Sequence, residues 1–183
     1  IQLMGYQSAL VQESKIQLGH YALVVSKDQF EDLGNSFDCL VVAWQPKAMK
    51  IGENDVRSVF DFNSPEFKQI NDLSLTPNSG CLAGPEFLIY VPINKKWAGF
   101  FMSSKTARRE AKNMKPLLGK AATLTSRLIS KGKYKWHGPT ITPCTTPFEV
   151  PSIDEIKEYV AKFNNQKESD QREAVADTGD RVR

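Results

Sequence analysis

The sequence has no run of about 18 apolar residues, which is the length that a membrane-spanning helix needs. Its apolar stretches, such as Cys39 to Trp44, have the length of single strands. Hydrophobic residues make up 40% of the 183 positions, which is enough to bury one sizeable core. We therefore expect a soluble protein with no membrane segment, and not a disordered chain.

Histidine and cysteine are also scarce. Two histidines, His20 and His137, cannot build a histidine-rich metal site. Cys39, Cys81 and Cys144 are odd in number, widely spaced and never arranged as C-x-x-C, which predicts reduced thiols and no structural zinc. Because no secretory signal pattern is visible, these thiols indicate a cytoplasmic protein.

Most enzyme signatures are missing as well. The sequence has no H-E-x-x-H, G-x-S-x-G or G-x-G-x-x-G motif, and neither Gly119-Lys120 nor Gly132-Lys133 completes a phosphate-binding loop. We therefore predict that the protein is not an enzyme and needs no cofactor or metal. Cys81 has no histidine near it in the sequence, so a buried thiol is expected there rather than a nucleophile.

One enzymatic alternative remains. Glu66 and Lys68 have the E-x-K spacing of metal-dependent nucleases, in which Asp55 or Asp61 would share a divalent cation with Glu66. The same stretch also predicts the start of a helix, because the Ser-Pro pair before Glu66 suits an N-cap and a first helical position.

Acidic residues are nearly absent from one part of the chain. Residues 1–90 carry 6 basic and 11 acidic residues, and residues 138–183 carry 6 and 9. Residues 91–137, the basic segment, carry 12 basic residues and a single acid, Glu110. The net charge of +3 is therefore the sum of a +11 segment and two acidic flanks, which indicates a polyanionic partner.

The order of the predicted elements indicates an antiparallel barrel. We expect strands over 18–25 and 38–44, a short polar segment with one helical turn over 26–34, and a loop over 80–85. A hairpin over 87–102, a helix over 105–115 and a second hairpin over 121–142 follow. The predicted fold is mainly β with helices (α+β), an oligonucleotide-binding (OB)-like barrel with its helix between the third and fourth strands.

The last part of the chain predicts a helix and a tail. Ser152 and Glu155 form a capping-box pattern before a helix over 153–164. Residues 166–183 are polar and are expected to be flexible. The predicted organisation is one OB-like nucleic-acid-binding domain over 1–150, a C-terminal helix over 151–165 and a flexible tail over 166–183.

The helix predicted in the basic segment has one cationic face, because its basic residues recur at spacings of three and four. Like charges at this spacing repel each other unless an anion neutralises them. The plain alternative is a solvated helix face, but such a face normally mixes acids with bases. The candidate phosphate-binding residues of this helix are Lys105, Arg108, Arg109, Lys112 and Lys115.

The second predicted hairpin adds cations that alternate with aromatics. In its K-Y-K-W-H stretch, a regular strand places the lysines and the histidine on one face and Tyr134 and Trp136 on the other. The aromatics are then either core residues or a stacking surface for nucleic-acid bases, and Trp97 in the first hairpin leaves the same choice open. The candidate residues of this region are Lys120, Arg127, Lys131, Lys133, Tyr134, Lys135, Trp136 and His137.

Parts of the sequence resemble proteins encoded in bacteriophage replication and recombination gene blocks. The resemblance is carried by GCLAGPEFL at 80–88, FMSSKTARRE at 101–110 and KWHGP at 135–139, together with 38–46. It implies a phage-type single-stranded DNA-binding protein with an OB-like barrel, acting in the host cytoplasm without a cofactor and with replication or recombination proteins as further partners. Such proteins often end in a strongly acidic tail, whereas residues 166–183 carry 5 acids and 4 bases, which puts tail-mediated recruitment in doubt.

Three functions are consistent with these features. The leading hypothesis is sequence-tolerant binding of single-stranded DNA, with RNA as a ligand and homo-oligomerisation left open. The first alternative is a virion or assembly protein whose basic segment contacts packaged genome or sibling subunits. The second is the metal-dependent nuclease at Glu66 and Lys68.

Overall fold

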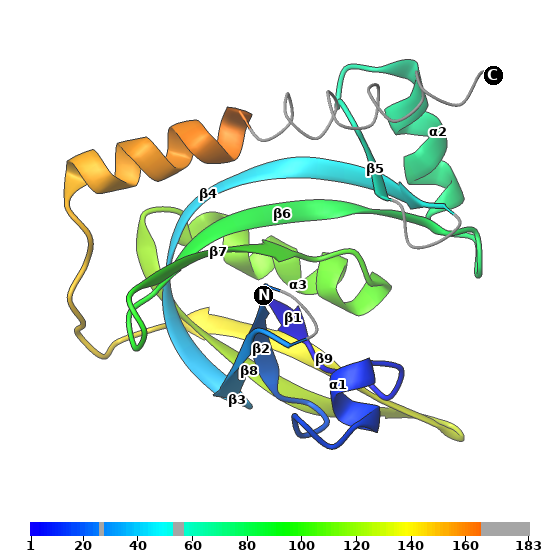
Figure 1. Ribbon diagram of the computed structural model, residues 1–183, viewed down its shortest axis with the longest axis horizontal. Helices are drawn as coiled ribbons and strands as arrows, with labels where there is room; N and C mark the ends of the chain where they lie inside the picture. The colour runs from blue at the N-terminus through cyan, green and yellow to red at the C-terminus, as the bar shows by residue number, and fades with distance from the viewer. Residues whose placement is uncertain (26–27, 53–56, 166–183) are drawn as a thin grey trace.

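The computed structural model describes residues 1–25, 28–52 and 57–165. Its architecture is mainly antiparallel β with several helices, which confirms the predicted fold class. Two sheets and the helix α3 (Lys105–Met114) surround the main core (Figure 1). The tail predicted to be flexible, 166–183, lies outside the described residues.

The larger sheet has the strand order β7-β6-β4-β8-β9, with β5 also paired to β4. Figure 1 shows β4 and β6 arching over α3. In chain order α3 lies between β7 and β8, after four of the six strands of this sheet, rather than between the third and fourth strands as predicted. The bounds are β4 Ser36–Ile51, β5 Arg57–Phe60, β6 Cys81–Val91, β7 Lys96–Phe101, β8 Lys120–Lys131 and β9 Tyr134–Pro143.

The sheet does not close into the predicted barrel. β7 and β9 are the two ends of the strand order, and no pairing joins them among the described residues. The first residues lie at this opening instead, because the Ile1 amino group contacts the Gly99 carbonyl of β7 and β1 contacts β9. A small second sheet, β1-β2-β3, therefore lies at the opening between β7 and β9. Its strands are β1 Gln2–Leu3, β2 Tyr21–Val24 and β3 Phe30–Gly34.

The main core joins both sheets and α3. Tyr21 of β2 is fully buried and packs edge-on against Phe37 of β4, with 5.1 Å between the ring centroids. Its hydroxyl donates a hydrogen bond of 3.2 Å to the Thr125 carbonyl of β8, and burial raises the pKa of this hydroxyl. Met114 of α3 and Leu124 of β8 are fully buried in the same cluster. Core packing thus fixes α3 and the first half of β8 relative to each other.

Two local predictions are wrong, because both segments become strands by pairing with another strand. In the segment 26–34, predicted to hold a helical turn, residues 26–27 lie outside the described residues and the remainder contains β3, which pairs with β2. The predicted loop over 80–85 contains the first residues of β6, because the register with β4 continues to Cys81.

Glycine and proline within these strands have local explanations. A Cβ at Gly84 would lie 2.3 Å from the Met102 carbonyl oxygen, so only glycine allows the backbone to approach this closely. Pro46 lies within β4, between the residues that pair with β8, Ser36–Val41, and those that pair with β5, Ala48–Ile51. A missing backbone donor is tolerated at such a position.

The predicted caps set the helix boundaries. Ser64 Oγ accepts a hydrogen bond of 3.2 Å from Phe67 N and begins α2 (Pro65–Leu73). Ser104 Oγ accepts one of 3.1 Å from Ala107 N and begins α3. The other short helices are α1 (Ala9–Gln12) and the 3-10 helix η2 (Lys115–Leu117), which follows α3 directly.

A C-terminal helix covers residues 153–165, close to the predicted range. Ser152 Oγ accepts a hydrogen bond of 3.2 Å from Glu155 N, as its capping pattern predicts. The carboxylate of Glu155 accepts a hydrogen bond of 2.8 Å from the indole of Trp97. The helix is therefore joined to β7 by a side-chain contact.

Candidate nucleic-acid interface

The cationic face predicted for α3 is present. Ala107, Ala111 and Met114 are buried and attach the helix to the core. With 3.6 residues per turn, the basic residues lie on the side of the helix turned away from this apolar stripe. All are exposed except Arg108, which is half-buried. The residues are Lys105, Arg108, Arg109 and Lys112 of α3 and Lys115, the first residue of η2, and we call these five the α3 cations.

Among the described residues, the α3 cations have no acidic partner, which also holds for Lys50, Arg57 and Lys68 but not for several lysines elsewhere. Lys95, Lys96 and Lys47 form ion pairs with Glu149, Glu31 and Glu86 at 3.0, 2.8 and 2.8 Å. Among the described residues, none of the five α3 cations makes an ion pair, and the same holds for Lys120, Lys131, Lys133 and Lys135. Positive charge therefore accumulates over α3 and the following hairpin.

Two of the helix cations also position neighbouring groups. Lys115 Nζ lies 3.6 Å from the ring centroid of Trp44, and Arg108 Nη1 donates a hydrogen bond of 3.3 Å to Ser74 Oγ after α2. Trp44 is 39% exposed, so it presents aromatic surface at the end of the cationic face. Sequence reasoning missed Trp44 as a site residue, because it ends an apolar run that predicts a buried strand.

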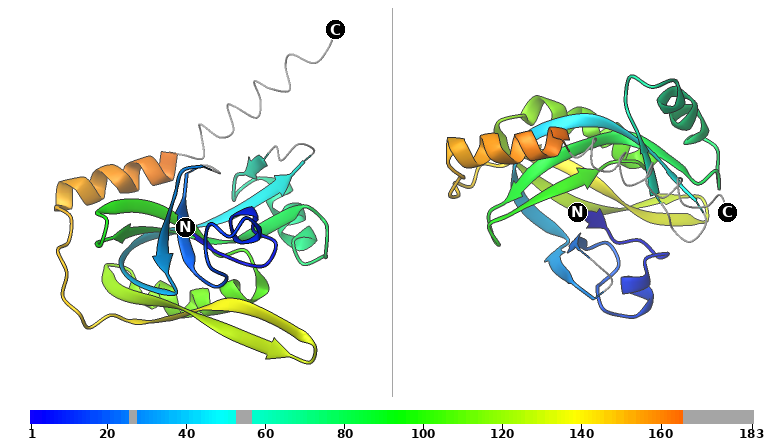
Figure 2. Two further views of the ribbon diagram at one scale, coloured as in Figure 1. Left: turned by 60° about the horizontal axis from the view of Figure 1, so that its bottom comes forward. Right: turned by 45° about the horizontal axis from the view of Figure 1, so that its top comes forward.

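The second half of the β8–β9 hairpin extends beyond the sheet (Figure 2). β4 pairs with β8 over Lys120–Thr125, whereas β8 and β9 remain paired with each other to Lys131 and Tyr134. We call the part from 126 to 139 the arm. Lys120 lies at the other end of β8, opposite Val41, so the structure separates it from the cations of the arm.

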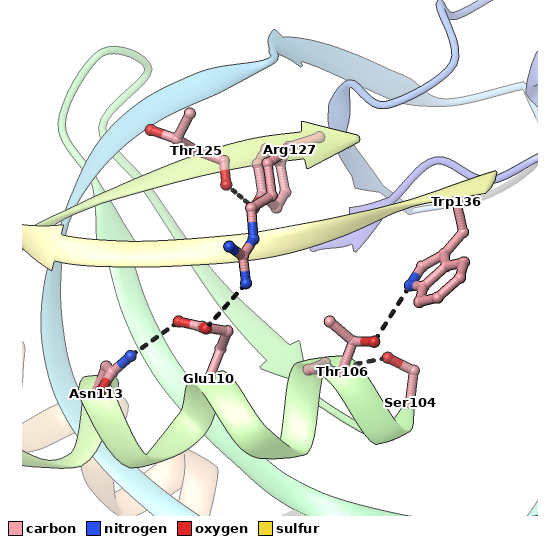
Figure 3. A network of polar contacts seen from close by, with 9 residues as sticks. Ser104, Thr106, Glu110, Asn113, Thr125, Arg127 and Trp136 are labelled. Atoms are coloured by element: carbon pink, nitrogen blue, oxygen red, sulfur yellow. Dashed lines mark hydrogen bonds and ion pairs between the residues drawn. The ribbon is translucent and has the colours of Figure 1, made fainter. Parts of the chain in front are cut away.

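The arm is attached to α3 by the polar contacts drawn in Figure 3. Arg127 lies 3.6 Å from the carboxylate of Glu110, whose side chain is 12% exposed and also accepts a hydrogen bond of 2.9 Å from Asn113. The Trp136 indole donates a hydrogen bond of 3.2 Å to Thr106 Oγ1. The single acid of the basic segment thus holds the arm against the helix.

Gly138 allows the arm to approach α3 closely. A Cβ at this position would lie 2.7 Å from both Thr106 Cγ2 and Ile129 Cδ1. The strand register places Arg127 opposite Gly138 and Ile129 opposite Trp136. These four residues therefore share the face of the arm that meets α3.

The aromatic residues of the arm are neither core residues nor fully exposed. Trp136 is half-buried and lies outside the core clusters, while Tyr134 is 66% exposed. Lys131 lies opposite Tyr134 in the register, and Lys133 Nζ lies 5.6 Å from the Tyr134 ring centroid. The two rings and these cations are thus available together on the arm.

The remaining strand candidates, Lys135 and His137, lie on the opposite face of the arm, as the predicted alternation requires. Lys135 is exposed, but His137 is packed against Gly19, where a Cβ would lie 2.5 Å from the imidazole ring. Its Nδ1 is buried without a hydrogen-bond partner among the described residues. His137 is therefore separated from the surface formed by α3 and the aromatics.

The described nuclease candidates, Asp61, Glu66 and Lys68, form no metal site among the described residues. Glu66 and Lys68 lie two positions apart on α2, where side chains point in different directions. The Asp61 carboxylate accepts a hydrogen bond of 2.7 Å from Asn63 N, and Asp55 lies outside the described residues. No group of three or more potential metal ligands occurs in the described part of the chain.

The cysteines are free thiols, as predicted. Cys39 and Cys81 are buried and Cys144 is partly exposed. Burial raises the pKa of the Cys39 thiol, which makes a nucleophilic thiolate unfavourable there. Within 1–25, 28–52 and 57–165, no helix has the length and apolar character needed to span a bilayer.

Comparison with known proteins gives no match to a protein family model, a curated protein or a solved structure.

Proposed function

We propose that the protein binds single-stranded DNA, with little dependence on sequence, through a cationic surface formed by α3 and the arm. The observation that carries the proposal is the clustering, on one face, of five cations without acidic partners among the described residues, next to an arm with two partly exposed aromatic rings. A solvated face would gain stability from interspersed carboxylates, whereas a phosphate-binding face must keep its cations unpaired.

The two kinds of side chain suit the two parts of a nucleic-acid strand. Lysine and arginine on α3 attract phosphates without reading sequence. Tyr134 and Trp136 offer ring faces on which bases can stack, and stacking tolerates every base. Bases are available for stacking when they are unpaired, so this combination favours a single strand over a duplex.

The setting of the proposal is phage DNA replication or recombination, and it rests on the sequence resemblance. Neither part of the binding chemistry calls for a cofactor or a covalent step. DNA and RNA share phosphates and stacking bases, so we expect a parallel titration with single-stranded RNA to measure how far the surface distinguishes the two.

A double substitution tests the surface directly. Arg109→Ala with Lys112→Ala removes two exposed cations from α3, and Lys50→Ala with Lys68→Ala removes two exposed cations from β4 and α2. We expect fluorescence anisotropy with labelled oligo-dT to show weaker binding for the first pair and little change for the second. Equal losses for both pairs would mean that net charge alone attracts DNA, and would contradict the proposed surface.

A further inference from the structure

Trp97 of β7 lies beneath the C-terminal helix. The Tyr159 ring stacks on it with 4.5 Å between the centroids and 10° between the planes. The indole N–H of Trp97 donates its hydrogen bond to Glu155 of the same helix. Trp97 also contacts Tyr90, its partner in the β6–β7 pairing, at 5.3 Å. Both the ring and the N–H of Trp97 are thus engaged by the helix.

The segment before this helix contacts the same hairpin. The carboxylate of Glu149 lies 3.0 Å from Lys95 Nζ, in an ion pair whose side chains are 70% and 78% exposed. We call residues 149–163 the cover. The cover therefore supplies a carboxylate to a lysine and a flat ring to a tryptophan two residues further along the chain.

The first part of the cover is held by contacts that water and salt weaken. An ion pair as exposed as Lys95–Glu149 contributes little to stability. Val150 and Ile153 are 58% and 72% exposed, so the first part of the cover gains little from apolar burial. Phe163 is buried and anchors the far end of the helix. Tyr159 is thus the main apolar contact through which the cover reaches Trp97.

We propose that Trp97 and Lys95 form a second nucleotide-binding site, which the cover occupies when no nucleic acid is bound. A strand of nucleic acid offers the chemistry that the cover imitates: an anion for Lys95 and a flat ring for Trp97. Bound DNA displaces Tyr159 and Glu149, and the cover competes with it. The inference rests on the proposed function and extends it from one surface to two.

Binding measurements on the full chain test the competition. Tyr159→Ala removes the competing ring, and we expect oligo-dT to bind about tenfold more tightly, as for one added base stack. Ile153→Ala, an exposed residue of the same helix, is the matched control and leaves the affinity unchanged. Adding Trp97→Leu to Tyr159→Ala abolishes the gain, because the ring that receives the base is lost. An unchanged or lower affinity for Tyr159→Ala would overturn the inference.

Hydrogen exchange provides a second readout on the unaltered protein. Saturating oligo-dT is expected to increase amide exchange in residues 153–165, because the helix leaves Trp97. Unchanged or greater protection of this helix in the complex would contradict displacement.

The two proposals fail in different ways. If the protein binds oligo-dT and Arg109→Ala with Lys112→Ala weakens binding, but Tyr159→Ala and hydrogen exchange show no effect, the second site alone is disproved. If neither the wild-type chain nor Tyr159→Ala binds at low salt, both proposals fail. If the wild-type protein does not bind oligo-dT but Tyr159→Ala does, the second site is supported and the cover is the cause of the weak wild-type affinity.

Discussion

At the scale of single residues, Trp136 is the residue of the arm that both contacts α3 and keeps part of its ring exposed. Its indole donates to Thr106 while its ring stays half-buried and outside the core clusters. A tryptophan in this position has one part fixed by the protein and another part available to a ligand. The alternating strand pattern could not show whether Trp136 is buried in the core or exposed for stacking. Its exposure depends on how α3 packs against the arm, which the sequence pattern does not show.

Trp136→Ala should therefore weaken DNA binding much more than it destabilises the fold. The loss of one base stack costs about 1–3 kcal/mol of binding free energy. Anisotropy with oligo-dT measures the affinity, and thermal unfolding followed by circular dichroism measures the stability. Trp136→Phe retains a ring and should recover most of the affinity. If Trp136→Ala unfolds and Trp136→Phe binds no DNA, Trp136 is a structural residue rather than a stacking residue.

Other residue contacts were beyond the reach of the sequence. The five cations of α3 could be predicted because helical spacing alone puts them on one face. The contacts Lys115–Trp44 and Trp97–Tyr159 join residues 71 and 62 positions apart. No local spacing predicts which aromatics such distant elements bring together.

At the scale of elements, the hairpins and capped helices follow from short signals. Ser104 predicts the start of α3, and the turn at Lys131-Gly132 predicts the reversal between β8 and β9. β3 and the beginning of β6 could not be predicted in the same way, because they become strands by pairing with β2 and β4. The open sheet depends on β1, whose two residues carry no strand signal of their own.

The attachment of the arm to α3 gives a prediction at this scale. Gly138→Ala places a Cβ against Thr106 and Ile129, which should lower stability by about 1–3 kcal/mol or move the arm away from α3. Urea unfolding measures the first effect, and weaker oligo-dT binding reports the second. Gly5→Ala is the matched control, because a Cβ there meets no atom within 4 Å. If Gly138→Ala and Gly5→Ala were equally stable and bound DNA equally, the close contact between arm and helix would be contradicted.

At the scale of the whole molecule, opposite charges are separated in space. A hollow of about 560 Å³ is lined by four carboxylates, from Glu31, Asp32, Asp38 and Glu149, with apolar residues between them. Glu31 and Glu149 are ion-paired with Lys96 and Lys95, so the repulsion of phosphates from this hollow comes mainly from Asp32 and Asp38. The modest net charge of +3 thus describes neither surface, and under the proposed function these acidic residues direct DNA away from the hollow.

The dependence of DNA affinity on salt tests the central claim most directly. If the five α3 cations each contact one phosphate of a single strand, the logarithm of affinity falls against the logarithm of salt concentration with a slope of about −3.5. The measurement is an anisotropy titration of labelled oligo-dT at salt concentrations from about 50 to 200 mM, with duplex DNA of the same length as competitor. We predict a steep negative slope and poor competition by the duplex. Absence of binding at the lowest salt, or an affinity that does not change with salt, would contradict the account.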